Sequence, residues 1–188
     1  MKLTPQAIPE VLLIEPARHG DARGFFSEVW KRSALAAQGF SVDFVQDNHS
    51  HSRAVGVLRG LHFQRPPSAQ GKLVRVVRGA ILDVAVDIRQ GSPSYGQHVA
   101  VELSAENWRQ LWVPRGFAHG FVTLTPDTEV IYKVDAEYDP ATDAGIAWDD
   151  LALGIAWPVP PGGTLLSDKD RRAPKLAEIA PPFPVGSW

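Results

Sequence analysis

Apolar and polar residues alternate along residues 81–89, which read ILDVAVDIR. The even-numbered positions are all apolar, while Asp83, Asp87 and Arg89 fall on the other face. A period of two is the spacing of side chains on a β-strand, so the pattern predicts a strand here. Residues 72–78, KLVRVVR, precede it across Gly79, and the two segments together predict a β-hairpin.

Short apolar runs recur along the chain with turn residues between them. Their spacing of about 8–12 residues is typical of an antiparallel sandwich or barrel, so the pattern predicts an all-β fold. The further predicted strands are 55–64, 97–103, 110–113, 117–125 and 129–135.

Helical patterns are few and short. Residues 25–38 contain no glycine or proline and end before Gly39, which predicts a helix with Gly39 at its C-terminal cap. Residues 104–111 predict a second short helix or a turn, since Ser104 is a suitable N-cap.

The composition agrees with a chain of short strands. Among 188 residues there are 16 glycines and 16 prolines, well above the roughly 12% of average usage. This density excludes long helical bundles and coiled coils. The length predicts a single domain over residues 1–188, and the proline-rich C-terminal tail, about 175–188, is expected to wrap the surface.

Charge and cysteine content exclude several classes of protein. Nineteen basic and 21 acidic side chains give a net charge of −2, without the basic surplus of a nucleic-acid-binding protein. No cysteine is present, and no apolar run approaches the length of a membrane span. The N-terminal residues do not resemble a signal peptide, so a cytoplasmic location is expected.

Histidines supply the first candidate chemistry. His49 and His51 are spaced to lie on one face of a strand, as metal ligands do in many small barrels, but no carboxylate follows at short range. His62 and Gln64 share a face in RGLHFQ, and Arg59 falls on the other. A β-bulge at Gly60 would re-aim one of these side chains into a polar cavity.

Tyrosine and lysine side chains extend this candidate site. Tyr132 falls on the same strand face as two valines and is predicted to point inward, either as a core residue or as a proton donor. Lys72, with Arg23, Arg59 and His119, would form a cationic pocket for phosphate. Neither a P-loop nor a GxSxG motif is present, so those nucleotide-binding and hydrolase classes are not indicated.

Nine motifs occur in a fixed order across residues 8–176. They are 23–28 (RGFFSE), 46–50 (QDNHS), 57–64 (VLRGLHFQ), 70–75 (QGKLVR), 83–89 (DVAVDIR), 110–121 (QLWVPRGFAHGF), 132–133 (YK), 145–150 (GIAWDD) and 166–170 (LSDKD). Together they resemble the dTDP-4-dehydrorhamnose 3,5-epimerase family. The resemblance implies a cupin-type jelly roll with a few short helices, a homodimer, and no metal or other cofactor.

The resemblance also implies a substrate and a reaction. The substrate would be dTDP-4-dehydro-6-deoxy-D-glucose, and the product dTDP-4-dehydro-L-rhamnose on the way to dTDP-L-rhamnose. His62 matches the general base, Asp170 the carboxylate that orients it, and Lys72 the cation near the developing oxyanion. Tyr132 matches the acid that returns a proton to the opposite face of the sugar.

Further matched positions imply substrate binding, and some are expected to act across the dimer, Arg23 and Glu28 among them. The binding positions are Arg23, Phe25, Glu28, Gln46, Asn48, Arg59, Asp83, His119, Tyr138, Asp143 and Lys169.

Two departures from the family pattern are Phe63, where a tyrosine is common, and Glu137, where an aromatic residue is common. The alternatives are an epimerase of one carbon only, a ketoisomerase of the same nucleotide-sugar, or a metal-binding or non-catalytic sugar-binding barrel.

Overall fold

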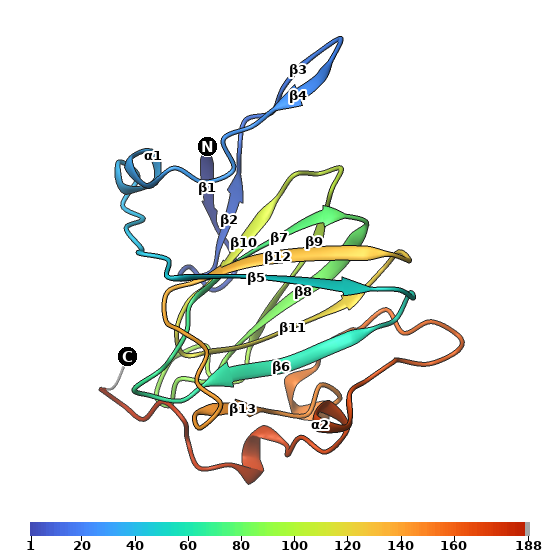
Figure 1. Ribbon diagram of the computed structural model, residues 1–188. Helices are drawn as coiled ribbons and strands as arrows, with labels where there is room; N and C mark the ends of the chain where they lie inside the picture. Colours follow the sequence, from blue (N-terminus) through green and yellow to red (C-terminus); the bar gives the residue numbers. More distant parts are fainter. Residues whose placement is uncertain (187–188) are drawn as a thin grey trace.

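Two antiparallel sheets face each other in the computed structural model, which describes residues 1–186 (Figure 1). The main core lies between them and takes side chains from both, including Val74 and Leu111 from one sheet and Ile81, Ala85 and Phe121 from the other. The expected all-β architecture with few short helices is confirmed.

The strands divide six to five between the two sheets, with one separate hairpin. The six-stranded sheet runs β1 (Lys2–Pro5), β2 (Leu12–Glu15), β10 (Gln110–Val113), β7 (Lys72–Arg78), β12 (Thr128–Val134), β5 (Gln46–Ser52). The five-stranded sheet runs β13 (Asp143–Gly145), β6 (Leu58–Gln64), β11 (Phe117–Thr123), β8 (Ala80–Asp87), β9 (His98–Ser104). The hairpin of β3 (His19–Asp21) and β4 (Gly24–Phe26) extends away from the two sheets in Figure 1.

The predicted strands are all present, but the predicted hairpin is wrong. The bounds of β7 and β10 match the prediction, and the other predicted strands differ by a few residues. However, β7 and β8 belong to different sheets. Gly79 has φ +77° and redirects the chain from one sheet to the other, and a Cβ there would meet Thr125 and Thr128 at about 2.5 Å.

The predicted helix 25–38 is also largely wrong. Only α1 (Arg32–Ala36) is helical, because Phe25 belongs to β4 and packs edge-on against Trp108 at 4.8 Å. Gly39 does follow the helix with φ +83°.

In residues 104–111 the turn prediction is confirmed. The Ser104 hydroxyl accepts from the Asn107 amide, the Asn107 side chain accepts in return from the Ser104 amide, and β10 begins at residue 110.

Both faces of β8 are buried. The face that carries Asp83 and Asp87 also carries Ile81 and Ala85 and lies inside, between the sheets. The opposite face packs against the C-terminal segment, the part of the chain that follows β13. This segment runs beneath β6 and β13 in Figure 1.

That segment contains three short helices: η1 (Leu151–Leu153), α2 (Asp168–Arg171) and η2 (Leu176–Glu178). Within the predicted tail, Leu176 and Phe183 are buried against the five-stranded sheet; residues 187–188 lie outside the described part of the chain.

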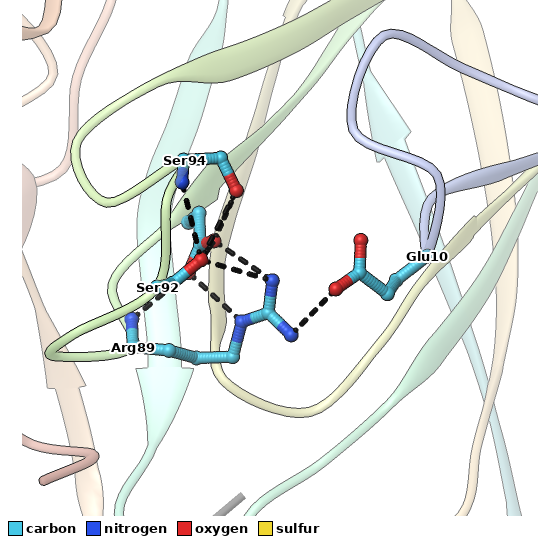
Figure 2. Close-up of polar contacts among 5 residues, drawn as sticks. Glu10, Arg89, Ser92 and Ser94 are labelled. Atoms are coloured by element: carbon cyan, nitrogen blue, oxygen red, sulfur yellow. Dashed lines mark hydrogen bonds and ion pairs between the residues drawn. The ribbon is translucent and has the colours of Figure 1, made fainter. Parts of the chain in front are cut away.

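A buried ion-pair network ties β8 to the loops around it (Figure 2). Arg89 donates through Nε and Nη2 to the two oxygens of Asp87, at 2.9 and 2.8 Å, and through Nη1 to Glu10 at 3.0 Å. Ser92 and Ser94 also donate to Asp87. Burial would raise the pKa of Asp87, but these hydrogen bonds outweigh it and hold the pKa below its usual value.

Within residues 1–186, helices are short, and none is long and apolar enough to cross a membrane.

Candidate active site

A cavity of about 460 Å³ opens between the two sheets and gathers the four candidate catalytic side chains. His62 comes from β6, Lys72 from β7 and Tyr132 from β12, while Asp170 comes from α2 in the C-terminal segment. Because β6 and β12 lie in opposite sheets, His62 and Tyr132 enter the cavity from opposite sides.

The imidazole of His62 is held by the buried carboxylate of Asp170. The His62 Nε2 to Asp170 Oδ1 distance is 2.6 Å. Burial tends to raise the pKa of Asp170, but the hydrogen bond with His62 and others keep it below the usual value, so the carboxylate is ionised at neutral pH. Ser167, the N-cap of α2, accepts from the Asp170 amide and fixes this turn. Nδ1 is therefore the ring nitrogen left to exchange a proton.

Lys72 is a half-buried cation that lines the cavity beside His62. Burial lowers its pKa from about 10.5 to about 8, against the opposing attraction of Asp143 and Asp83. Its Nζ donates to the carbonyl oxygen of His62 at 3.5 Å. The ammonium group is thus mostly charged at neutral pH and lies beside the histidine.

Tyr132 points inward, as predicted, and packs against the main core. Burial raises the pKa of its phenol, while nearby Arg59 opposes the shift. The group therefore stays protonated at neutral pH and is available as a proton donor.

A second histidine–aspartate pair lies next to the first. His119 of β11 is directly opposite His62 in the β6–β11 register, and its Nε2 lies 2.7 Å from Asp83 Oδ1. Asp83 is fully buried behind His119. Asp83 also attracts the ammonium group of Lys72.

The predicted irregularity at Gly60 is confirmed. The β6–β11 register shifts opposite this residue, which has φ +128°, and a Cβ there would meet Gly120 Cα at 2.5 Å. As a result Arg59 and His62 both line the cavity, although strict alternation places them on opposite faces.

A second cavity, of about 210 Å³, shares His62, Lys72 and Tyr132 with the first. Five of the predicted binding residues also line this cavity: Gln46, Asn48, Tyr138, Asp143 and Lys169.

These residues are linked to one another. Lys169 forms an ion pair with Asp143, Tyr138 donates from its hydroxyl to Asp143, and Gln46 accepts from the Tyr138 amide. Tyr138 is 56% exposed, so its ring is free to stack on a planar group.

Four predicted residues line neither cavity: Asp83, which is buried behind His119, and three residues near the N-terminus. Arg23, Phe25 and Glu28 belong to the β3–β4 hairpin and the segment that follows it. Arg23 bonds Asp21, and Phe25 and Phe26 are 52% and 68% exposed. Within one protomer these side chains do not contribute to the cavity around His62.

The histidine pair on β5 does not form a shared site. His49 pairs with Glu129 and His51 with Asp127. No group of three or more histidine, cysteine, aspartate or glutamate side chains within the described residues could hold a metal ion.

Sequence reasoning missed several cavity residues: Ser50, Val57, Leu58, Phe121, Leu165, Leu166 and Ser167. The alternation of β5 could have indicated Ser50, because it lies two and four residues from Asn48 and Gln46.

Comparisons with known proteins agree on one family. The model of the family described as dTDP-4-dehydrorhamnose 3,5-epimerase matches residues 5–178. A dTDP-4-dehydrorhamnose 3,5-epimerase of Sinorhizobium fredii is 53% identical over 177 residues, which cover 94% of this chain and 90% of the relative.

Two solved structures are also similar. A dTDP-6-deoxy-D-glucose-3,5-epimerase of Legionella pneumophila in complex with dTDP-4-keto-L-rhamnose is 45% identical, with a TM-score of 0.91, covering 95% of this chain and 94% of that one. A 3′-monoepimerase of Streptomyces bikiniensis in complex with dTDP-quinovose is 37% identical, with a TM-score of 0.85, covering 92% and 87%. The same architecture thus supports epimerisation at one or at two carbons.

Proposed function

The chain belongs to the dTDP-4-dehydrorhamnose 3,5-epimerase family, and we propose that it converts dTDP-4-dehydro-6-deoxy-D-glucose to dTDP-4-dehydro-L-rhamnose in dTDP-L-rhamnose biosynthesis. The observation that carries this proposal is the placement of His62 and Tyr132 in opposite sheets around one cavity, with Lys72 beside them. Inversion of a carbon requires a proton acceptor and a proton donor on opposite faces of the sugar ring.

In the proposed first step, Nδ1 of His62 removes the proton from C3 or C5. The electron pair of that C–H bond forms a C=C bond to C4, and the ketone oxygen becomes an oxyanion. Asp170 keeps the other imidazole nitrogen protonated and stabilises the cation that forms. The Lys72 ammonium group stabilises the oxyanion. A charge that is already in place stabilises an oxyanion better than water does, because it needs no reorientation during the reaction.

In the second step, the Tyr132 hydroxyl gives its proton to the opposite face of the same carbon. The C=C bond returns to a C4 ketone, and solvent carries the proton from His62 back to Tyr132. Repeating the two steps at the second carbon completes the product. We propose no cofactor for this chemistry, because the C4 carbonyl itself delocalises the negative charge.

Nucleotide binding is proposed for the second cavity and for a partner subunit. Lys169, Asn48 and Gln46 offer charge and hydrogen bonds beside the reacting residues. The extended β3–β4 hairpin, with Arg23 and Glu28, suits contact with the site of a second protomer in a homodimer. We propose that the chain acts as one domain, and a cytoplasmic location fits a charged nucleotide-sugar substrate.

A single-carbon epimerase is the second candidate, because the similar 3′-monoepimerase has the same fold. One experiment separates the candidates: incubation with dTDP-4-dehydro-6-deoxy-D-glucose in deuterated water, followed by NMR at C3 and C5. Deuterium at both carbons is expected, and deuterium at one would favour the second candidate.

A variant of the base completes this test. His62→Ala should abolish exchange at both carbons. Absence of exchange with the unmodified protein would exclude both enzymes, and exchange retained in His62→Ala would exclude His62 as the base.

A further inference from the structure

Two buried side-chain polar atoms in the described part of the chain make no hydrogen bond: Ser50 Oγ and Asp83 Oδ2. Such atoms are rare in native proteins, and each has a structural or functional reason. Asp83 has partners for its charge, since its other oxygen bonds His119 and it attracts Lys72. Ser50 is a neutral residue whose only polar side-chain atom is unpaired.

Ser50 lies on the cavity side of β5. It is directly opposite Val130 on β12, and Asn48, two residues earlier, is opposite Tyr132. Side chains at alternate positions of a strand, and at opposed positions of neighbouring strands, share a face. The Ser50 hydroxyl therefore lies on the same face as Asn48 and the Tyr132 phenol, and Ser50 lines the main cavity.

Neighbouring polar groups have other partners. The Nε of Arg59 donates to Ser52 and its Nη2 to the His51 carbonyl, so this guanidinium is anchored along β5 beside Ser50. His62 and His119 are each bound to an aspartate. Among the described residues that line the main cavity, only Ser50 has a side-chain polar atom that is both buried and without a partner.

We propose that Ser50 determines substrate specificity by hydrogen-bonding the hydroxyl group at C2 of the sugar ring, after rotation about its Cα–Cβ bond brings the buried Oγ to the cavity surface. This inference rests on the proposed function. A serine hydroxyl both donates and accepts, which matches a sugar hydroxyl. The apolar part of the cavity wall, including Phe121, Leu165 and Leu166, suits the C6 methyl group of a 6-deoxysugar. The cavity thus has a polar side for the sugar hydroxyl groups and an apolar side for the methyl group.

The contact should affect substrate binding more than the chemical step. A sugar hydroxyl that does not react is bound in both the ground state and the transition state, so its loss raises KM and leaves kcat nearly unchanged. Removal of one neutral hydrogen bond should lower kcat/KM roughly three- to tenfold.

The test combines the substitution Ser50→Ala with removal of a hydroxyl group from the substrate, as in a double-mutant cycle. The substrate and its 2-deoxy and 3-deoxy analogues are assayed for KM and kcat by deuterium incorporation at C5. Ser50→Ala should raise KM for the parent substrate about three- to tenfold, and should have no effect with the 2-deoxy analogue, which lacks the bonded hydroxyl. No effect on the parent, or an equal loss with all three substrates, would overturn the inference.

Ser52→Ala is the matched control. Ser52 is the next residue on the same face of β5, but its hydroxyl bonds Arg59 and does not line the cavity. Any loss that it causes should be equal for all three substrates.

Two further measurements separate failure of this inference from failure of the proposed function. Ser50→Ala should melt at or above the wild-type temperature, because it removes a buried hydroxyl without a partner; a clear fall would contradict that assignment. If the unmodified protein incorporates no deuterium, the proposed function fails rather than the role of Ser50.

Discussion

The Lys72 ammonium group titrates near neutral pH because burial lowers its pKa to about 8. Below this pH the side chain is a cation and can stabilise an oxyanion; above it, the neutral amine cannot. We therefore expect kcat/KM to fall as the pH rises through about 8, with the slope of one proton, in a pH–rate profile. The raised pKa of Tyr132 places loss of its proton at higher pH, so the two groups are distinguishable.

The variant Lys72→Arg tests this assignment. A guanidinium group does not lose its proton in this range, so the alkaline fall should disappear from the profile even if the maximal rate is lower. An alkaline fall that persists unchanged in Lys72→Arg would assign it to another group.

At the residue scale, the sequence predicted which side chains meet, but not which of them have a hydrogen-bond partner. His62, Lys72 and Tyr132 were expected at one site, and the structure brings them to one cavity. The unpaired hydroxyl of Ser50 was not predictable, because it depends on what Arg59 and the neighbouring strands place around it. Hydrogen-bond pairing of this kind is a property of the three-dimensional arrangement.

At the element scale, the network around Asp87 joins β8 to two loops and should contribute strongly to stability. Asp87 is fully buried and Arg89 almost so. Asp87→Asn would leave the guanidinium without its charged partner, which we expect to lower the free energy of unfolding by roughly 3 kcal/mol. Urea denaturation at pH 7 measures this change.

The contribution of Asp87 to the free energy of unfolding depends on pH with a definite sign. The folded pKa of Asp87 is below its unfolded value, so its stabilisation is present above the unfolded pKa near 3.8 and is lost as the pH falls through the folded value. Asp87→Asn should remove that part of the acid sensitivity.

The matched control is Asp21→Asn. Asp21 and Arg23 form the same fork two residues apart, but on the exposed β3–β4 hairpin. This substitution should leave the melting temperature nearly unchanged. An equal effect of both substitutions would contradict the role given to burial.

Most strands with an apolar face were predictable, although the short β2 (LLIE) was not, and β5, which has no apolar face, was not either. β5 reads QDNHSHS and was missed because it has no apolar residue. One face of β5 turns Gln46, Asn48 and Ser50 toward the cavities. The other face is stabilised by ion pairs to β12 and the turn before it, such as Lys133 with Asp47. The pairing of β7 and β8 was mispredicted because a glycine between two apolar runs suits a hairpin and a crossing between sheets equally well.

At the scale of the whole molecule, the β3–β4 hairpin is the part that the fold of one protomer does not explain. It extends from the sheets in Figure 1 and exposes two phenylalanines, Phe25 and Phe26, together with Arg23. An exposed pair of aromatic side chains on a projecting hairpin is typical of a contact surface. In the proposed homodimer, the hairpin of each protomer would contribute Arg23, and the segment after it Glu28, to the partner's site.

Mixed dimers test this arrangement directly. Arg23→Ala and His62→Ala proteins should each be nearly inactive alone. After denaturation together and refolding, a dimer with one chain of each kind has one site in which His62 comes from one protomer and Arg23 from the other. That site is intact, and its companion carries both substitutions.

Random pairing makes about half of the dimers mixed, so the refolded mixture should recover about a quarter of the wild-type activity in a symmetric dimer. Recovery would place Arg23 in the partner's site, because a site built within one protomer stays broken in every pairing. Refolding each variant by itself is the control for the procedure. A size tag on one chain shows whether mixed dimers have formed. If they form and no activity is recovered, Arg23 does not act in the partner's site, and the proposed arrangement is wrong.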